Sequence, residues 1–455
     1  MPKPLSIVCA CDEHATDVAR AAAMIGAVVE TETTDAPLEA ASARVADAPV
    51  LAVVTDEPPS PEALVALSDA ASAAHTRVAL AFVRAAADPL WRHLAHDLGM
   101  PAVTDVEALL STAAWLRLGV RGSVDASPSG LTPHDRARFG EAPARRERRP
   151  RRVVRGSLER SGGGLFAWRP DDGGAPVVLG TARAVRAALA ALDDLSTGRR
   201  PPAASVEGVN TDAVRESLFG PPRALSDPTS KSVLAAYDVP LPLEELCASA
   251  TRAAAEATQI GFPVRLAIAS PDLRIWDHPD LVTDGVDNAA RVRDVYRQTL
   301  AFARARQPDA RLLGVTVSAT TTAIAELRAH LSCLDGDRVL ARIGFADPHG
   351  LASADETLAV LPWDARGVAQ VLGRLEGASL LFGAAEADAE ASVRSVGEIL
   401  LRTAALVRDH RDFIDAVELD PIALLPNAAA EVREACVHVS DGFERLLASP
   451  RAAAR

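Results

Sequence analysis

The most constraining feature of this sequence is one continuous stretch, residues 225–272, in which helical segments lead into an apolar strand. Residues 231–237 are good helix formers, and Pro240 ends that helix because proline cannot continue it. Residues 243–258 repeat Leu, Ala and Cys at helical spacing, which predicts a second, longer helix. After a Gly-Phe-Pro break, residues 264–269 are apolar enough to form a central strand.

This order resembles the opening of the ATP-grasp domain in nucleoside-diphosphate-forming acyl-CoA synthetases, which are relatives of succinyl-CoA synthetase. The family pattern there is roughly L-x-E-x-E-A-K-x-L-L-x-x-Y-G-I-P, followed by I-G-Y-P-V-V-L-K-I-x-S-P-D. The positions in register are Leu225, Lys231, Leu234, Tyr237, Pro240, Gly261, Pro263, Val264, Leu266, Ile268, Ser270, Pro271 and Asp272. The resemblance is specific because it joins two segments at the family's spacing.

Later segments continue the resemblance to about residue 439. Residues 312–317 are similar to the family's I-x-G-V-x-V-Q strand, and residues 413–425, FIDAVELDPIALL, to its E-L-D-I-N-P-L-L-V terminus. A helix is expected ahead of the first of these segments, over residues 289–306. The resemblance implies an ATP-grasp fold of two α+β lobes over residues 206–445, followed by a tail of residues 446–455.

The N-terminal region, residues 1–121, has a different organisation. Five apolar strands alternate with helices, which predicts an α/β fold with a doubly wound parallel sheet of the flavodoxin-like kind. The expected strands are residues 5–10, 27–29, 50–54, 78–83 and 102–103. The end of this region is similar to the last flavodoxin-like ligase subdomain of the same synthetases. Its first loop, residues 11–14, contains two acids and no glycine, so phosphate or CoA binding there is not favoured.

Residues 122–205 separate these two regions. An arginine- and proline-rich linker is followed by a small βββα insert, with short strands over 153–158, 165–168 and 176–179 and a helix over 182–192. We expect residues 123–152 to be cleaved first by trypsin, because they combine low hydrophobicity with clustered charge. The arginine run is either a solvated linker or a contact for an anion or a partner.

Composition excludes several function classes. A net charge of -13 argues against a general nucleic-acid binder, and the sequence has neither a leader nor an apolar run of about 18 residues. We therefore expect a cytoplasmic protein without membrane association, and the abundant Ala, Arg and Pro suggest a bacterial source. The five scattered cysteines predict reduced thiols. Cys9, Cys11 and His14 could ligate a metal, although packing explains the two thiols more simply.

The candidate nucleotide-binding residues depart from the family pattern. The family's phosphate-binding lysine falls on Ala267, and its glutamine after the G-V-x-V strand falls on Ser318. The H-K-S-D-V-G-G-V loop falls on residues 275–282, which lose both glycines and the lysine. The arginine before A-P-L falls on Ala359, and the glycine-rich F-G-L-G-G turn is reduced to residues 344–347.

Acidic residues are retained where the resemblance implies metal binding. Glu418 and Asp420 occupy the Mg²⁺-ligand positions and lie on one face of the expected strand, because they are two residues apart. Glu326 falls where the family has an acid on its G-x-E-L strand, so it lines the nucleotide site with Ala267 and Ser318 in this prediction. The alternative is that these acids are charged positions left on the wall of the site.

Two functions from different classes follow from these residues. The first is an ADP-forming acyl-CoA synthetase-like ATP-grasp protein without catalytic residues, which acts as a regulatory or binding module and binds Mg-ATP or Mg-GTP weakly. The second is an active ATP- or GTP-dependent acid-CoA ligase subunit that uses substitute residues such as Arg265 or Arg274. A third interpretation is a partner-binding protein that acts through its arginine-rich insert. The sequence leaves CoA binding open, since the CoA-binding domain would come from another chain.

Overall fold

The computed structural model describes residues 4–84, 88–119, 125–130, 155–170, 175–193, 195, 206, 208–275, 277–334, 337–346, 355–382 and 386–448. The chain divides into two compact units, residues 1–199 and residues 200–455, and each has its own sheets and core. Within the described residues, no helix is long and apolar enough to cross a membrane.

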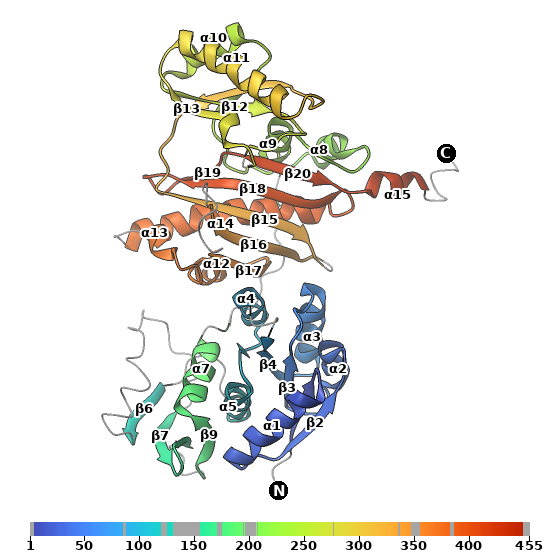
Figure 1. Ribbon diagram of the computed structural model, residues 1–455, viewed down its shortest axis with the longest axis vertical. Coiled ribbons are helices and arrows are strands. Elements are labelled where there is room, and N and C mark those ends of the chain that lie inside the picture. Colours follow the sequence, from blue (N-terminus) through green and yellow to red (C-terminus); the bar gives the residue numbers. More distant parts are fainter. Residues whose placement is uncertain are drawn as a thin grey trace. The chain divides into compact units, whose positions relative to one another are not determined.

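The first unit is built on a parallel sheet with the strand order β2-β1-β3-β4-β5 (Figure 1). Its elements are β1 (Leu5–Cys9), α1 (Asp12–Ile25), β2 (Val29–Thr33), α2 (Pro37–Arg44), β3 (Val50–Thr55), α3 (Pro61–Ala73), β4 (Arg77–Phe82), α4 (Pro89–Asp97), β5 (Ala102–Val103) and α5 (Val106–Arg117). Strands β1 and β3 are parallel neighbours, which confirms the expected flavodoxin-like sheet. Helices connect consecutive parallel strands and cover the sheet, as buried apolar strands require.

The βββα insert belongs to the same unit. Strands β6 (Asp125–Gly130), β7 (Arg155–Ser161), β8 (Leu165–Pro170) and β9 (Val177–Thr181) form a second sheet, followed by α7 (Ala182–Asp193). Trp168 of β8 packs edge-on against Trp115 of α5, with ring centroids 4.9 Å apart. The insert therefore shares one core with the parallel sheet.

One strand lies within the segment expected to be a linker. Residues 125–130 form β6 because their backbone pairs in parallel with β7. The remainder of that segment, residues 123–124 and 131–152, lies outside the described residues, so its early cleavage by trypsin stays a prediction.

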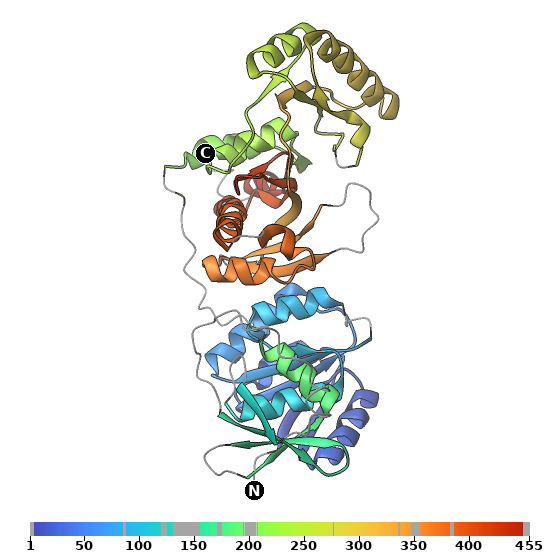
Figure 2. The ribbon, with the colours of Figure 1, turned by 90° about the vertical axis from the view of Figure 1, so that its left-hand side faces the viewer.

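The second unit contains a large lobe and a small lobe. The large sheet has the order β10-β20-β18-β15-β16-β17, with β19 paired to β18. Its strands and helices are α8 (Thr211–Leu218), β10 (Arg223–Ala224), α9 (Asp227–Ala235), β15 (Ala325–Cys333), β16 (Val339–Phe345), β17 (Glu356–Leu361), α12 (Ala365–Leu372), α13 (Ala378–Phe382), α14 (Glu386–Asp409), β18 (Ile414–Leu424), β19 (Ala430–Val432), β20 (Ala435–Val439) and α15 (Gly442–Ala448). The long helix α14 packs along one face of this sheet (Figure 1, Figure 2).

The small lobe is a four-stranded antiparallel sheet covered on one face by two helices (Figure 2). It consists of β11 (Glu244–Cys247), α10 (Ala250–Ile260), β12 (Val264–Ala269), η2 (Pro279–Leu281), β13 (Val282–Val286), α11 (Ala289–Arg306) and β14 (Gly314–Ala319). Gly314 has a φ of +145°, and a Cβ atom there would lie 2.3 Å from the carbonyl oxygen of Cys247. The glycine of the G-V-x-V strand is therefore required for the close approach of two backbones.

One expected helix in the small lobe was wrong in its first part. Residues 243–258 were expected to be helical, but residues 244–247 form β11, which pairs with β14. The helix begins only after Ser249, whose hydroxyl accepts a hydrogen bond from the backbone N–H of Arg252. Pairing with a strand about 70 residues away satisfies the backbone groups that a helix would have satisfied locally.

Candidate functional site

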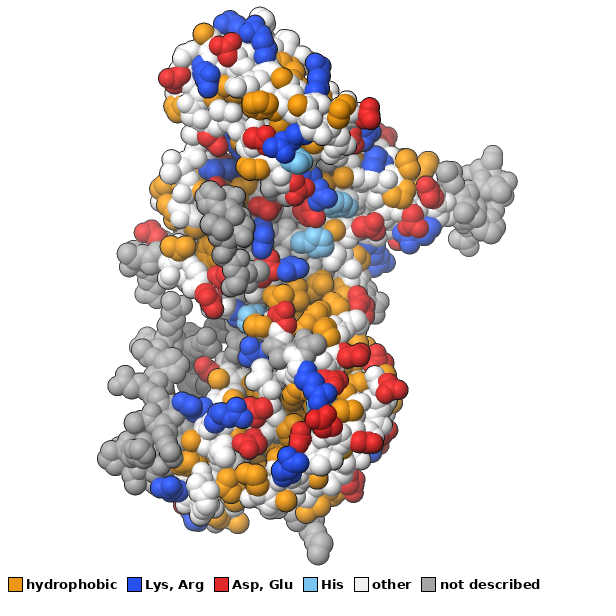
Figure 3. Space-filling view, viewed as in Figure 1, with side chains coloured by type: hydrophobic (Ala, Val, Ile, Leu, Met, Phe, Trp, Pro, Cys, Tyr) orange, Lys and Arg blue, Asp and Glu red, His pale blue; other side chains and the backbone are white. Residues whose placement is uncertain are grey.

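The large sheet has one apolar face and one polar face. On β18, Val417 and Leu419 belong to the core beneath α14, so Glu418 and Asp420 alternate onto the opposite face. The neighbouring strands add further side chains to this face, which we call the polar sheet face: Glu326, Arg328, His330, Glu418, Asp420, Cys436 and His438. Figure 3 shows histidine and charged side chains gathered over the large sheet.

Glu418 lies at the centre of the polar sheet face and is contacted by two cationic side chains. Nη1 of Arg274, in the loop after β12, is 3.1 Å from Oε2 of Glu418, and Nε2 of His438 is 3.3 Å from the same oxygen. Cys436 and Glu418 together raise the pKa of His438 to about 10. His438 and Arg274 in turn hold the pKa of Glu418 below its ordinary value, so the carboxylate is ionised and already neutralised.

Asp420, the second expected Mg²⁺ ligand, has a different electrostatic environment. Burial, together with the nearby carboxylates of Glu326, Glu418 and Asp277, raises its pKa to about 6, and Arg328 opposes this shift. Asp420 therefore keeps its proton to a higher pH than an ordinary aspartate, but it is mostly ionised at neutral pH. The proton would compete with a cation mainly below about pH 6, since Mg²⁺ prefers charged oxygen donors.

Glu326 is held at the start of β15 by an arginine. Nη1 of Arg433 donates to Oε1 of Glu326 at 2.7 Å, and Nη2 of Arg433 donates to the backbone oxygen and hydroxyl of Thr321. Glu326 therefore has an internal partner, and its carboxylate contributes to the negative field at Asp420.

The two expected nucleotide-binding residues of the small lobe are buried. Ala267 of β12 is 4% exposed and belongs to the same apolar cluster as Leu273 and Ile275 of the following loop. Ser318 of β14 is 7% exposed and pairs in register with Arg265 and with Glu244. The position expected to correspond to the family's lysine is thus a methyl group in an apolar environment.

The loop expected to correspond to the family's phosphate-covering loop, residues 275–282, has a buried apolar side chain near each end. Ile275 and Leu281 at its two ends are buried, and residues 279–281 form the 3₁₀ turn η2. Asp280 is bound by Arg306 of α11, with Nη2 2.9 Å from Oδ2. Ala359 of β17, which was expected to fall at the position of a family arginine, is fully buried in the core of the large lobe.

A buried network of charges, which sequence reasoning missed, joins the two lobes. Lys231 of α9 lies 2.9 Å from Asp227 and 2.7 Å from Glu244 of β11, and its side chain is 5% exposed. Arg265 of β12 lies 2.7 Å from Glu434, whose side chain is 3% exposed. The only sequence signal was the four-residue spacing of Asp227 and Lys231 on one helix face.

This network shifts the pKa values of its members. Burial raises the pKa of Glu434 to about 8, and the charge of Asp227 adds to the shift. The carboxylates of Asp227, Glu434 and Glu244 raise the pKa of Lys231, although burial alone would lower it. Lys231 and Arg265 are therefore paired with acidic side chains inside the protein, so they are not available to bind phosphate.

Two groups of side chains could hold a metal ion in the part of the chain that the structure describes. One is Glu418, Cys436 and His438 on the polar sheet face, and the other is Cys11, His14 and Asp56 in the first unit. In the first group, a metal would have to displace Arg274 and a protonated His438 from Glu418. Neither group pairs Glu418 with Asp420.

Comparisons with known proteins place the second unit among ATP-grasp proteins. Residues 220–434 match the family described as ATP-grasp domain. The beta subunit of acetate–CoA ligase (ADP-forming) II from Pyrococcus furiosus is 23% identical over 223 residues, which is 48% of this chain and 92% of that protein. The beta subunit of acetate–CoA ligase (ADP-forming) I from the same organism is 30% identical over 95 residues, which is 21% of this chain and 41% of that protein.

One similar solved structure is that of the Ca. Korarchaeum cryptofilum dinucleotide-forming acetyl-coenzyme A synthetase 1, in complex with coenzyme A, Ca-AMPCP and HgCl+. Its TM-score is 0.42, and its sequence is 20% identical. The similarity covers 48% of this chain and 93% of that chain.

Proposed function

We propose that this chain, whose residues 220–434 belong to the ATP-grasp family, is an acyl-CoA synthetase-like protein that acts as a regulatory or binding module without ligase catalysis. The observation that carries the proposal is that Glu418 is already paired with two cationic side chains. This expected Mg²⁺ ligand is already bound by Arg274 at 3.1 Å and approached by His438 at 3.3 Å. A magnesium ion would have to replace two cations that the protein itself supplies.

The small lobe supports the same proposal. A nucleotide brings roughly three to four negative charges, and these need cations or amide donors when the site is partly desolvated. Ala267 offers no charge, and Arg265 is bound to Glu434 at 2.7 Å. Each missing charge-assisted phosphate contact lowers affinity by about 10- to 150-fold, or about 1.5–3 kcal/mol. We therefore expect weak binding of Mg-ATP or Mg-GTP.

The proposal includes a second protein chain that binds this one. The similar acetate–CoA ligases are named as beta subunits, so their assemblies contain another subunit. By analogy, we propose that a second chain supplies any CoA-binding domain here, and that the ATP-grasp unit contributes regulation or binding to that complex.

The second candidate is an active ATP- or GTP-dependent acid-CoA ligase subunit with substitute residues. Its supporting observation is that Glu418 and Asp420 remain on one face of β18, with Arg274 close enough to contact a ligand there. In this alternative, Arg274 takes over a phosphate contact, and the ion pair with Glu418 opens when the nucleotide binds.

Calorimetric titration of Arg274→Met with Mg-ATP separates the two candidates. If Arg274 only neutralises Glu418, its removal frees a Mg²⁺ ligand, and affinity for Mg-ATP stays equal or rises. If Arg274 binds phosphate, affinity falls by about 10-fold or more. Arg297→Met is the matched control, because Arg297 pairs with Asp294 on the outer surface of α11 and both side chains are 67% exposed.

An activity assay completes the test. Wild-type protein, purified together with any chain that binds it, should form no acyl-CoA from Mg-ATP, CoA and a panel of short carboxylic acids. Micromolar binding of Mg-ATP by the wild type, together with acyl-CoA formation, would overturn the proposal and establish the ligase.

A further inference from the structure

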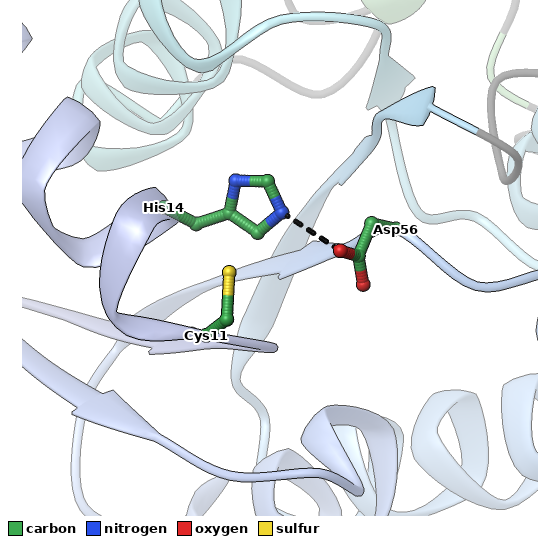
Figure 4. A group of neighbouring side chains, drawn as sticks. All are labelled: Cys11, His14 and Asp56. Carbon is green, nitrogen blue, oxygen red and sulfur yellow. Dashed lines mark hydrogen bonds and ion pairs between the residues drawn. The ribbon is translucent and has the colours of Figure 1, made fainter.

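The first unit contains three potential metal ligands that the proposed function does not use. Cys11, His14 and Asp56 each present one donor atom, and these atoms lie within 4.8 Å of one another. Figure 4 shows the three side chains pointing toward one another. Cys11 follows β1 and Asp56 follows β3, and between these strands the order of a doubly wound sheet reverses. Ligands of such sheets bind at this edge.

We propose that Cys11, His14 and Asp56 bind a divalent transition-metal ion, with zinc as the best match. Thiolate, imidazole and carboxylate are the three side-chain donors that zinc takes in proteins. Nε2 of His14 lies 3.3 Å from Oδ2 of Asp56. This contact is a hydrogen bond, and two ligands about 2.0–2.1 Å from a tetrahedral zinc ion lie about 3.3–3.4 Å apart, so zinc can replace the hydrogen bond with little change in the distance between the two atoms.

Local structure holds two of the ligands in place. Cys11 is the residue before α1, with an extended backbone at φ −156° and ψ 168°, and His14 lies in the first turn of the helix. This three-residue spacing brings both side chains to the same side of the helix start.

The charges around the group favour a cation. The thiolate of Cys11 and the carboxylate of Asp56 together balance the two positive charges of the ion, and Asp12 and Glu13 add to the negative field. Arg84 donates to Oδ2 of Asp56 at 3.2 Å and also pairs with Glu13. Its side chain is 51% exposed, so Arg84 can remain as a hydrogen-bonding partner of a metal-bound carboxylate.

The partial burial of these side chains is typical of a metal site that leaves one coordination position of the ion open. The side chain of His14 is 5% exposed and that of Asp56 is 22% exposed. Cys9, the other thiol in this segment, is fully buried in the core and is no part of the group. Three protein ligands leave the fourth position of a tetrahedral ion for water or for a small ligand.

Titration of the full-length, reduced protein with Co²⁺ tests the proposal, because a Co²⁺–thiolate bond produces a charge-transfer absorption band. We expect one equivalent with this band in the wild type and displacement by Zn²⁺, which binds more tightly than Co²⁺. The band should disappear in Cys11→Ser. Binding should weaken by about 10-fold or more in Asp56→Asn and in His14→Gln.

Cys436→Ser is the matched control, because the group of Glu418, Cys436 and His438 also offers a thiol. The band should survive in that variant. Circular dichroism of every variant checks the fold, and Asp56→Asn preserves the test if the buried His14 does not tolerate replacement. Absence of a thiolate band in the wild type, its persistence in Cys11→Ser, or its loss in Cys436→Ser would overturn the proposal. So would rapid alkylation of Cys11 that zinc does not slow.

Discussion

The guanidinium of Arg265 lies 2.7 Å from the carboxylate of Glu434, and this pair joins strand β12 of the small lobe to the residue before β20 in the large sheet. Both side chains are mostly buried, with 14% and 3% exposure. Arg265 also interacts with the carboxylates of Asp227 and Glu244, so its loss leaves Lys231 as the one cation for two buried carboxylates, even when Glu434 is protonated.

Arg265→Met should therefore destabilise the second unit by about 3 kcal/mol, measured by urea unfolding. Arg394→Met is the matched control, because Arg394 pairs with Glu390 on the exposed surface of α14, with 63% and 78% exposure, and its loss should cost at most about 0.5 kcal/mol. Equal losses in the two variants would contradict a structural role for the buried pair.

Glu434→Gln should remove a pH dependence from the stability of the second unit. Burial raises the pKa of Glu434 from 4.5 to about 8, so the folded state binds more protons than the unfolded state between these values. The stabilisation from this group is fully present below the unfolded pKa and is lost as pH rises through about 8.

Unfolding free energies of the wild type and of Glu434→Gln, measured from about pH 5 to about pH 8, check this expectation. The wild type should lose stability relative to the variant as pH rises, by at most about 1.4 kcal/mol per pH unit. A difference that stays constant over this range would indicate an ordinary, ionised Glu434.

Gly314→Ala should destabilise the small lobe by about 3 kcal/mol or more. A Cβ atom at this position would lie 2.3 Å from the backbone oxygen of Cys247, and its φ of +145° is unfavourable for alanine. Gly285→Ala is the control for the energetic cost of the backbone conformation alone. Gly285 has a φ of +70°, and a methyl group added there would meet no atom within 4 Å. That control should lose about 1 kcal/mol in thermal or urea unfolding.

Trp168→Leu should destabilise the whole first unit by about 2–4 kcal/mol, since Trp168 is fully buried against Trp115. Far-UV circular dichroism should report one cooperative transition for the parallel sheet and the insert together. Trp91→Leu on the half-buried side of α4 is the control and should lose less. If Trp168→Leu melts the insert and leaves the transition of the parallel sheet unchanged, the two parts do not share a core.

Local patterns in the sequence predicted most of the elements. The helix expected over residues 289–306 is α11, because its periodicity is regular and Asn288 caps its start. The alternation of apolar strands and helices predicted the five-stranded parallel sheet. The alternation within FIDAVELDPIALL also placed Glu418 and Asp420 on one face of β18, since successive side chains of a strand point to opposite faces.

Element boundaries and side-chain partners that depend on residues far apart in the sequence could not be predicted from local patterns. Residues 243–247 have a helical pattern, yet residues 244–247 pair with β14 at residues 315–318. Lys231 has the pattern of an ordinary helix residue, because nothing near it in sequence indicates that Glu244 would meet it. Cys11 and His14 were visible as neighbours, but Asp56, the third member of their group, lies 42 residues beyond His14.

The sequence by itself determined where most of the helices and strands form and which charged and apolar residues alternate along them. These properties depend on backbone preferences and side-chain identity over a few residues. Only the tertiary structure decided that Arg274 neutralises Glu418, 144 residues away, that Glu434 is buried beside Arg265, and that Asp56 joins Cys11 and His14. Charge pairing and burial are set by which strands become neighbours, and that follows from packing of the whole unit.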